Sequence, residues 1–150
     1  MDPTTEDREL VELDERECST LLALESVGRV AVGNATEAPD VVPVNFVVCD
    51  GDPVFRSHDG VLLDRIVGSH VSLQVDRFDW FHRVGWSVLV AGVGELLDPM
   101  EAERLLGSGL DDLDPWVPGD QPRLVRVRVR RITGRRIELH QVPLDGRGYL

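Results

Sequence analysis

The sequence predicts a single mainly β domain: a small barrel of six or seven short, mostly antiparallel strands with three peripheral helices. Apolar residues alternate with polar ones in short runs that glycine, proline and aspartate turns separate. The helical stretches do not alternate with the strands, and the sequence contains no glycine-rich fingerprint of a parallel nucleotide-binding sheet. With 150 residues, of which 42% are hydrophobic, the chain can bury one core without disulfides or metals.

The N-terminal part starts with a loose acidic tail, expected over residues 1–10. A helix is expected over residues 14–26, because Asp14 is a suitable N-cap and Glu17 follows it at the spacing of a capping box. The periodicity then becomes that of strands, and an Asp-Gly turn joins the second strand to the third as in a hairpin. These strands are expected at 27–32, 41–49 and 54–57.

The C-terminal part continues the strand pattern and contains two more helices. A short helix is expected over 61–67, and a second one opens on Asp98-Pro99 and runs to about 106, with proline at its first position. Glycines at 92 and 94 predict a bend or bulge in the longest strand. Strands are expected at 70–76, 85–97, 124–131 and 134–139; the domain then spans 11–140, and 141–150 form a C-terminal tail.

The charge and cysteine content exclude several classes of function. A net charge of −11 argues against nucleic acid or an anionic membrane as a partner, and no apolar run approaches the length of a membrane span. All sixteen basic residues are arginine, so chemistry through a lysine Schiff base is excluded. The N-terminal residues lack the pattern of a signal peptide, and Cys18 and Cys49 lack metal or redox spacing. We therefore expect a cytoplasmic protein with two buried thiols.

The most informative stretch runs from Val42 to Asp64, where a predicted hairpin ends in Arg56 and Ser57 and is followed by a glycine turn and a helix. A guanidinium, a hydroxyl and free backbone N–H groups are what a phosphate requires. Asn45, on the opposite strand, adds an amide beside them. The alternative is an ordinary solvated strand end, and for the neighbouring His58 and Asp59 a role in the turn is favoured over acid–base chemistry.

Other candidate sites have simpler explanations. The four histidines show no ligand spacing, so no metal is expected, and no serine has the context of a nucleophile elbow. Trp86 suits either the core or a flat ligand, and Arg29 suits a surface ion pair better than an anionic substrate. The arginines that alternate with valines are expected to pair with the surplus carboxylates, the alternative being an anionic ligand or a subunit contact; they are Arg126, Arg128 and Arg130.

Taken together, the segments resemble the pyridoxamine 5′-phosphate oxidase-like proteins of the FMN-binding split-barrel superfamily, in their actinobacterial branch. The resemblance covers nearly the whole chain in the order of the family. It is carried by ECSTLLALESVGRVAV (17–32), VVPVNFVV (41–48), VFRSHDG (54–60), RVGWSVLVAGVGELLDP (83–99), DPWVPG (114–119) and RVRRITGRRIEL (128–139).

This resemblance implies a Greek-key split β-barrel of the FMN-binding type that works as a homodimer, with flavin in clefts between the subunits. Arg56 and Ser57 match the positions that hold the FMN phosphate, and Asn45 lies on the strand along the isoalloxazine ring. Trp86 and Ser87 match positions that close the ring site. The full expected set of cofactor-binding residues is Val44, Asn45, Phe46, Arg56, Ser57, His58, Val61, Leu62, Trp86 and Ser87, and no catalytic residue is assigned.

One departure from the family bears on function. The family stretch is close to FRTxxGxKL, and Leu62 stands where the lysine is usual. Loss of one charge-assisted contact costs about 1.5–3 kcal/mol, or roughly ten- to a hundredfold in affinity. Three functions follow as expectations: an FMN-dependent oxidoreductase acting on an unidentified small molecule, a deazaflavin-dependent reductase on the same fold, or a non-catalytic cofactor-binding module.

Overall fold

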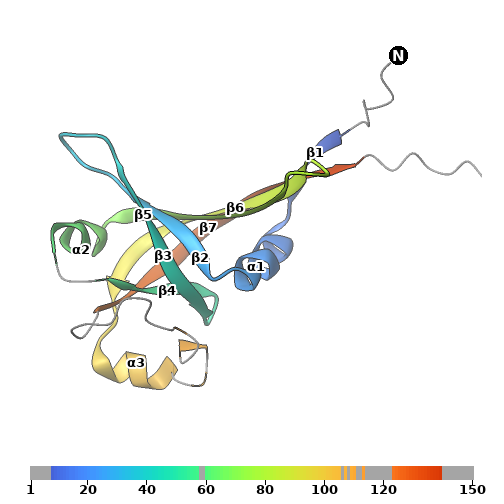
Figure 1. Ribbon diagram of the computed structural model, residues 1–150. Helices are drawn as coiled ribbons and strands as arrows, with labels where there is room; N and C mark the ends of the chain where they lie inside the picture. The colour runs from blue at the N-terminus through green and yellow to red at the C-terminus, as the bar shows by residue number, and fades with distance from the viewer. Residues whose placement is uncertain are drawn as a thin grey trace, which may run out of the picture.

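The computed structural model of the protein describes residues 8–57, 60–105, 107, 109, 110, 113 and 123–139. Six antiparallel strands form a closed ring in the order β7-β4-β3-β2-β5-β6, and pairing of β6 with β7 closes it (Figure 1). The fold is a split β-barrel, as the sequence predicts. The elements are β1 (Arg8–Leu13), α1 (Glu15–Leu24), β2 (Val27–Val32), β3 (Asp40–Cys49), β4 (Asp52–Ser57), α2 (Val61–Ile66), β5 (His70–Asp79), β6 (Val84–Leu96), α3 (Pro99–Leu105) and β7 (Arg123–Leu139).

Strand β7 corrects the prediction of two C-terminal strands, because it continues without a break for 17 residues. Its first part pairs with β4, most of its length pairs with β6, and its last six residues pair with β1. Gly134, the expected first residue of the second of these strands, lies in the interior of β7. A Cβ there would stand 2.7 Å from Cys18 Sγ and 2.9 Å from Ser87 O, so glycine is needed for the close approach of α1.

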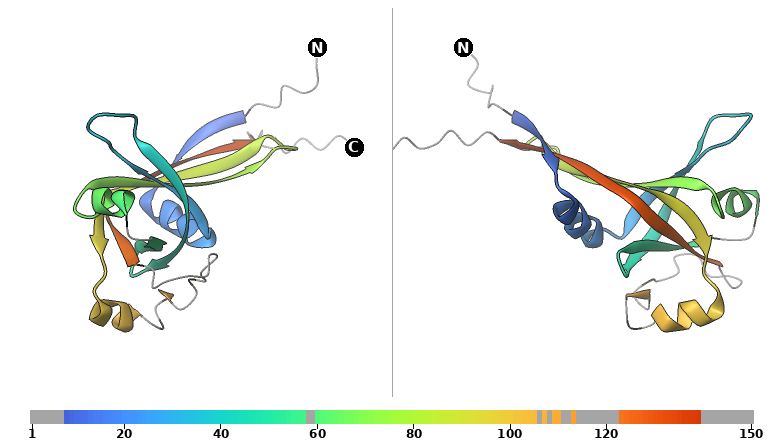
Figure 2. Two further views of the ribbon diagram at one scale, coloured as in Figure 1. Left: turned by 60° about the vertical axis from the view of Figure 1, so that its left-hand side comes forward. Right: turned by 180° about the vertical axis from the view of Figure 1, so that it is seen from behind.

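The outer end of β7 forms part of an arm that projects beyond the barrel, together with β1 and the ends of β5 and β6 (Figure 2). The predicted tail 1–10 is therefore wrong for its last three residues, which belong to β1: Arg8 lies opposite Leu139 and Leu10 opposite Ile137. Residues 1–7 and the expected C-terminal tail lie outside the described residues.

Several local signals read from the sequence are confirmed. Asp14 and Glu17 form both hydrogen bonds of a capping box on α1. The β3–β4 hairpin turns at Asp50 and Gly51, whose φ angles of 51° and 83° suit a two-residue turn. The predicted irregularity in the long strand is also present, as a register shift between Ala91 and Gly92 of β6.

The core consists of two clusters. The larger one fills the barrel with residues such as Phe46, Phe55 and Leu73, and α1 closes one end of it with Leu22 and Cys18. The smaller one lies under α3 and holds Cys49, Val54, Leu97, Leu105, Leu110 and Leu113. Both cysteines are buried free thiols. Within the described part of the chain, no helix has the length and apolar character needed to cross a membrane.

Candidate functional site

Arg56 and Asn45 lie on neighbouring strands at the same level of the barrel. The β3–β4 ladder ends at the pair Phe46 and Phe55, and both rings are buried in the main core. Asn45 precedes Phe46 by one position, and Arg56 follows Phe55 by one position. Because side chains alternate along a strand, Asn45 and Arg56 lie on the outer side of the barrel wall. The hairpin register therefore places the predicted amide and guanidinium on the same face of neighbouring strands.

The Arg56 guanidinium is held in place by a backbone carbonyl. Its Nη2 donates a hydrogen bond of 2.9 Å to Leu113 O, and the side chain is half-buried. Its Nε is buried and has no hydrogen-bond partner in the described part of the chain. A buried N–H without a partner costs free energy, so this guanidinium retains hydrogen-bonding capacity that an anion could use.

A cavity of about 450 Å³ lies beside the loop that holds Arg56, although Arg56 itself is not among the described residues that line it. Asn45 borders it, together with Leu113, whose carbonyl holds Arg56, and the C-terminal end of α1. Phe46 also borders the cavity, although its ring is buried in the core, and Val44 packs against the same core. Of the three predicted ring-contacting residues on β3, Asn45 is therefore the one with a polar side chain beside the cavity.

The residues after β4 are placed differently from the expected phosphate cradle. Val61 is 75% exposed at the start of α2. Leu62 is half-buried and packs against the main core, so the alkyl chain at the family's lysine position contributes to packing. Ser57 ends β4 next to Arg56. His58 lies outside the described residues, as does Asp59.

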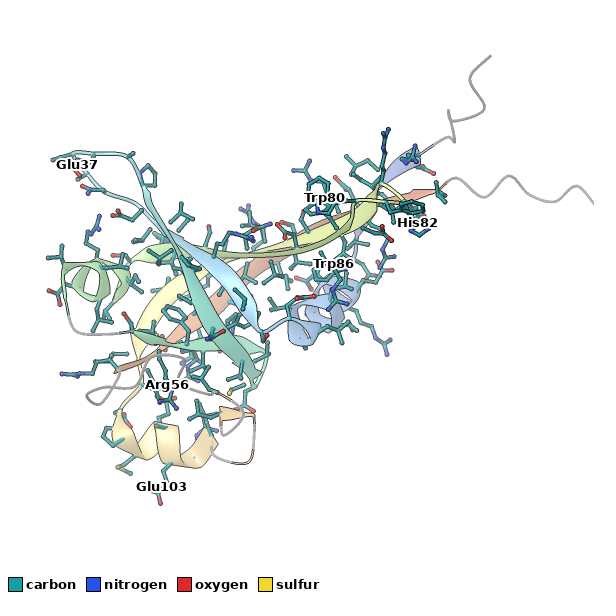
Figure 3. All side chains as sticks on the ribbon, viewed as in Figure 1. Glu37, Arg56, Trp80, His82, Trp86 and Glu103 are labelled. Carbon is teal, nitrogen blue, oxygen red and sulfur yellow. The ribbon has the colours of Figure 1, made fainter. Side chains whose placement is uncertain are left out.

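Trp86 and Ser87 lie on the arm, away from Arg56 (Figure 3). Trp86 is half-buried and pairs with Arg77 of β5 and with Arg136 of β7. It borders a cavity of about 840 Å³. Ser87 borders a separate cavity of about 490 Å³. Within one chain, the predicted cofactor-binding residues thus form two groups, one on the barrel wall and one on the arm.

The tip of the arm is a tight turn organised by Asp79. Its Oδ1 accepts hydrogen bonds of 3.0 Å from the backbone N–H groups of Phe81 and His82, and its Oδ2 lies 2.6 Å from His82 Nδ1. The hydrogen bonds from His82, first that of its backbone N–H, hold the pKa of Asp79 below its usual value. Trp80 and Phe81, at the tip, are 85% and 89% exposed.

Most of the arginines that were candidates for ligand binding are paired with carboxylates. Arg126 is buried and forms ion pairs with Glu101 and Glu95. Arg128 lies 3.0 Å from Glu95, whose hydrogen bond raises the pKa of the guanidinium. This pairing confirms the simpler of the two interpretations for these two side chains.

Arg29 forms the expected surface ion pair, with its Nη1 3.5 Å from Asp76 Oδ2. The described ranges contain no cluster of three or more His, Cys, Asp or Glu side chains that could hold a metal.

The contact that holds Arg56 could not be inferred from the sequence. Leu113 lies in a loop rich in glycine, aspartate and proline, and no sequence pattern indicates which backbone carbonyl of a loop accepts a hydrogen bond. Gly109 of the same loop has a φ of 108° and approaches β3 so closely that a Cβ would lie 3.0 Å from Val48 O. This close approach brings the loop, and with it Leu113, against the barrel wall.

Comparison with known proteins agrees with this architecture. The family model described as pyridoxamine 5′-phosphate oxidase matches residues 14–136. The chain is 34% identical over 137 residues to protein Rv0080 of Mycobacterium tuberculosis, which covers 87% of each. It is also similar to the structure of the FAD-binding protein of Mycobacterium smegmatis, with a TM-score of 0.72, 29% identity and coverage of 85% of this chain and 100% of that one.

A second solved structure, an FAD-binding protein of Mesorhizobium loti, gives a TM-score of 0.73 with 26% identity and covers 85% of this chain and 97% of its own. The family match extends from the cap of α1 to the arm portion of β7, and so includes both groups of candidate residues. The chain belongs to the pyridoxamine 5′-phosphate oxidase family.

Proposed function

We propose that this protein binds a flavin nucleotide and acts as a flavin-dependent oxidoreductase on a small molecule. The observation that carries the proposal is the half-buried guanidinium of Arg56, which Leu113 O orients and whose buried Nε has no partner among the described residues. A flavin phosphate is an anion that suits such a donor. Two similar structures at 29% and 26% identity are FAD-binding proteins, which supports the same cofactor class.

The residues of the barrel wall would bind and orient the cofactor. Arg56 would hold the phosphate, Ser57 would offer a hydroxyl beside it, and the Asn45 amide would form hydrogen bonds along the edge of the ring. When bound, the flavin supplies the hydride or electron transfer itself. The task of these side chains is therefore to hold its ring in one position and to keep water away from it.

The arm would complete the site from a second subunit. Arg56 and Trp86 lie on different parts of one chain, so a flavin at Arg56 meets the Trp86 indole only if another copy supplies it (Figure 3). We therefore propose a homodimer in which Trp86 and Ser87 of one subunit close the ring site of the other. A two-fold dimer would contain two equivalent sites of this kind.

The first experiment is a titration of the purified protein with FMN, FAD and a deazaflavin, followed by quenching of flavin fluorescence. We expect saturable FMN or FAD binding at about one flavin per subunit and a loss of roughly tenfold or more in Arg56→Ala. Arg16→Ala, which removes an exposed arginine on α1, is the matched control and should leave the affinity unchanged. Thermal unfolding of each variant shows whether it is folded.

Each outcome of this titration decides between functions. Deazaflavin binding with negligible FMN and FAD binding would reassign the protein as a deazaflavin-dependent reductase. Absence of binding by all three would favour a non-catalytic module and overturn the proposal. Equal affinities of Arg56→Ala and the wild type would show that the phosphate site has been placed wrongly.

A mixing experiment tests the shared site. Arg56→Ala and Trp86→Ala should each bind flavin weakly alone, because every site in either homodimer lacks one element. In a mixed dimer, one of the two sites combines an intact Arg56 with an intact Trp86, so mixing after mild dissociation should restore part of the binding. No recovery, although light scattering shows that dimers have exchanged, would contradict a site shared between subunits.

A further inference from the structure

Arg130 differs from the other arginines of the Arg-Val run because a β-bulge displaces it from the ladder. Ala91 of β6 pairs with Arg131, whereas the next residue, Gly92, pairs with Val129, which leaves Arg130 without an opposite residue. Bulges redirect side chains and occur often beside binding sites. A Cβ on Gly92 would collide with the carbonyl oxygen of Arg128, so a glycine is needed for this arrangement of the two strands.

The redirected arginine borders a cavity of about 370 Å³, which is a size typical of small-molecule sites. The cavity extends across β2, β5, β6 and β7, a width of about 14 Å at the usual strand spacing. Small side chains or none at Ala31, Gly33, Ser72 and Ala91 form its floor. The loop between β2 and β3 borders it with Pro39, while Glu37 lies at the far end of that loop (Figure 3).

The charge around this cavity favours an anion. The chain carries 27 acidic residues against 16 arginines, yet none of the described residues that line the cavity is acidic. Arg130 and His70 are there, and Ser72 adds a hydroxyl. The described residues offer Arg130 no carboxylate partner, in contrast to Arg126 and Arg128 on the same strand.

The acidic side chains of the adjoining strands are already engaged by other arginines. Asp40, at the start of β3, forms an ion pair with Arg65 of α2. Glu95, near the end of β6, lies 3.0 Å from Arg128 and 4.0 Å from Arg126. An incoming anion would therefore find Arg130 uncompensated, and it would not have to displace a carboxylate.

We propose that this cavity is a second ligand site that binds the carboxylate or phosphate of a small organic anion. The guanidinium of Arg130 holds the charged group, His70 and Ser72 offer further hydrogen bonds, and the small-residue floor takes the apolar part. The site is separate from the proposed flavin site, because Arg56 lies on β4, which does not contribute to this cavity. It stands whether or not a flavin binds.

The test uses phenyl phosphate and benzoate as anionic probes and benzyl alcohol as the neutral probe, followed by amide chemical shifts of the full-length protein. We expect one or both anions to bind saturably and to shift the amides of β5 and β6 around Ser72 and Ala91. Arg130→Ala should weaken this binding by about tenfold or more, and Arg130→Lys by less, since it keeps the charge without the bidentate geometry. The probe that binds identifies the anion class.

The matched control is again Arg16→Ala, which removes the same charge from an exposed position on α1. The proposal is overturned if neither anion binds, if benzyl alcohol binds equally well, or if Arg130→Ala and Arg16→Ala weaken binding to the same extent. Arg130 is exposed, so its variants should keep the unfolding midpoint of the wild type. Phenyl phosphate binding in Arg56→Ala reports on this site alone, which separates failure here from failure of the flavin proposal.

Discussion

The ion pair between Arg126 and Glu101 fastens α3 to the barrel and gives a quantitative prediction for Glu101→Gln. Arg126 is 2% exposed, so its charge would remain buried after the change. Removal of one partner of a fully buried pair costs about 3–5 kcal/mol. Here the Glu101 side chain is 32% exposed and Glu95 remains 4.0 Å from Arg126 Nε, so water and a second carboxylate compensate part of the loss. We expect a loss of about 2 kcal/mol in the free energy of unfolding.

Urea unfolding and calorimetry provide the measurement. A loss of about 2 kcal/mol corresponds to a fall of about 4–8 °C in Tm for a chain of this length. Glu103→Gln is the matched control, because Glu103 is exposed on the same helix (Figure 3). The double variant Glu101→Gln/Arg126→Met should lose less stability than the sum of the losses in Glu101→Gln and Arg126→Met, since the buried charge is gone. Equal stabilities of Glu101→Gln and Glu103→Gln would refute the reasoning.

Three further results are expected. Gly134→Ala should lower the free energy of unfolding by about 1–3 kcal/mol, because the new Cβ would crowd Cys18 Sγ, whereas Gly33→Ala, in open space, should change it little; equal urea midpoints would contradict this. The buried Cys18 thiol, whose pKa is raised chiefly by burial, should react with a disulfide reagent only as the protein unfolds, and fast labelling of the native protein would be incompatible with that. Asp79 should titrate with a pKa below its ordinary value of 3.8. The stabilisation that its carboxylate gives the turn is therefore present above pH 3.8 and is lost as the pH falls through the folded pKa. The amide shifts of His82 report this titration, and a midpoint at or above 3.8 would count against the capping role of Asp79.

The parts of the fold that short-range chemistry determines were predictable. The strand at 27–32 and the cap of α1 agree with the structure, because alternation and an Asp-x-x-Glu spacing act within a few residues. The placement of Asn45 and Arg56 on the same face of the hairpin also followed from the sequence, since a two-residue turn fixes the register of a hairpin.

Long-range pairing limited the rest. Strand β1 was missed because its partner is the far end of β7, and no residue pattern near β1 indicates that pairing. The continuity of β7 through Gly134 was missed, because the contact that requires a glycine there, with Cys18, is distant in sequence. The position of Arg130 depends on a bulge whose register shift arises between two strands. The arginines of β7 could therefore be identified from the sequence, but the position of Arg130 beside a cavity could not be predicted.

The role of β7 in closing the barrel has a consequence for biosynthesis. Strand β7, the last strand among the described residues, pairs with the free edges of β4 and β6 and with β1. A nascent chain that has emerged only as far as α3 therefore carries two unsatisfied strand edges, which are templates for association with other chains. We expect chains truncated before Arg123 to aggregate after release from the ribosome or to require a chaperone. In the completed fold, β7 pairs with both edges.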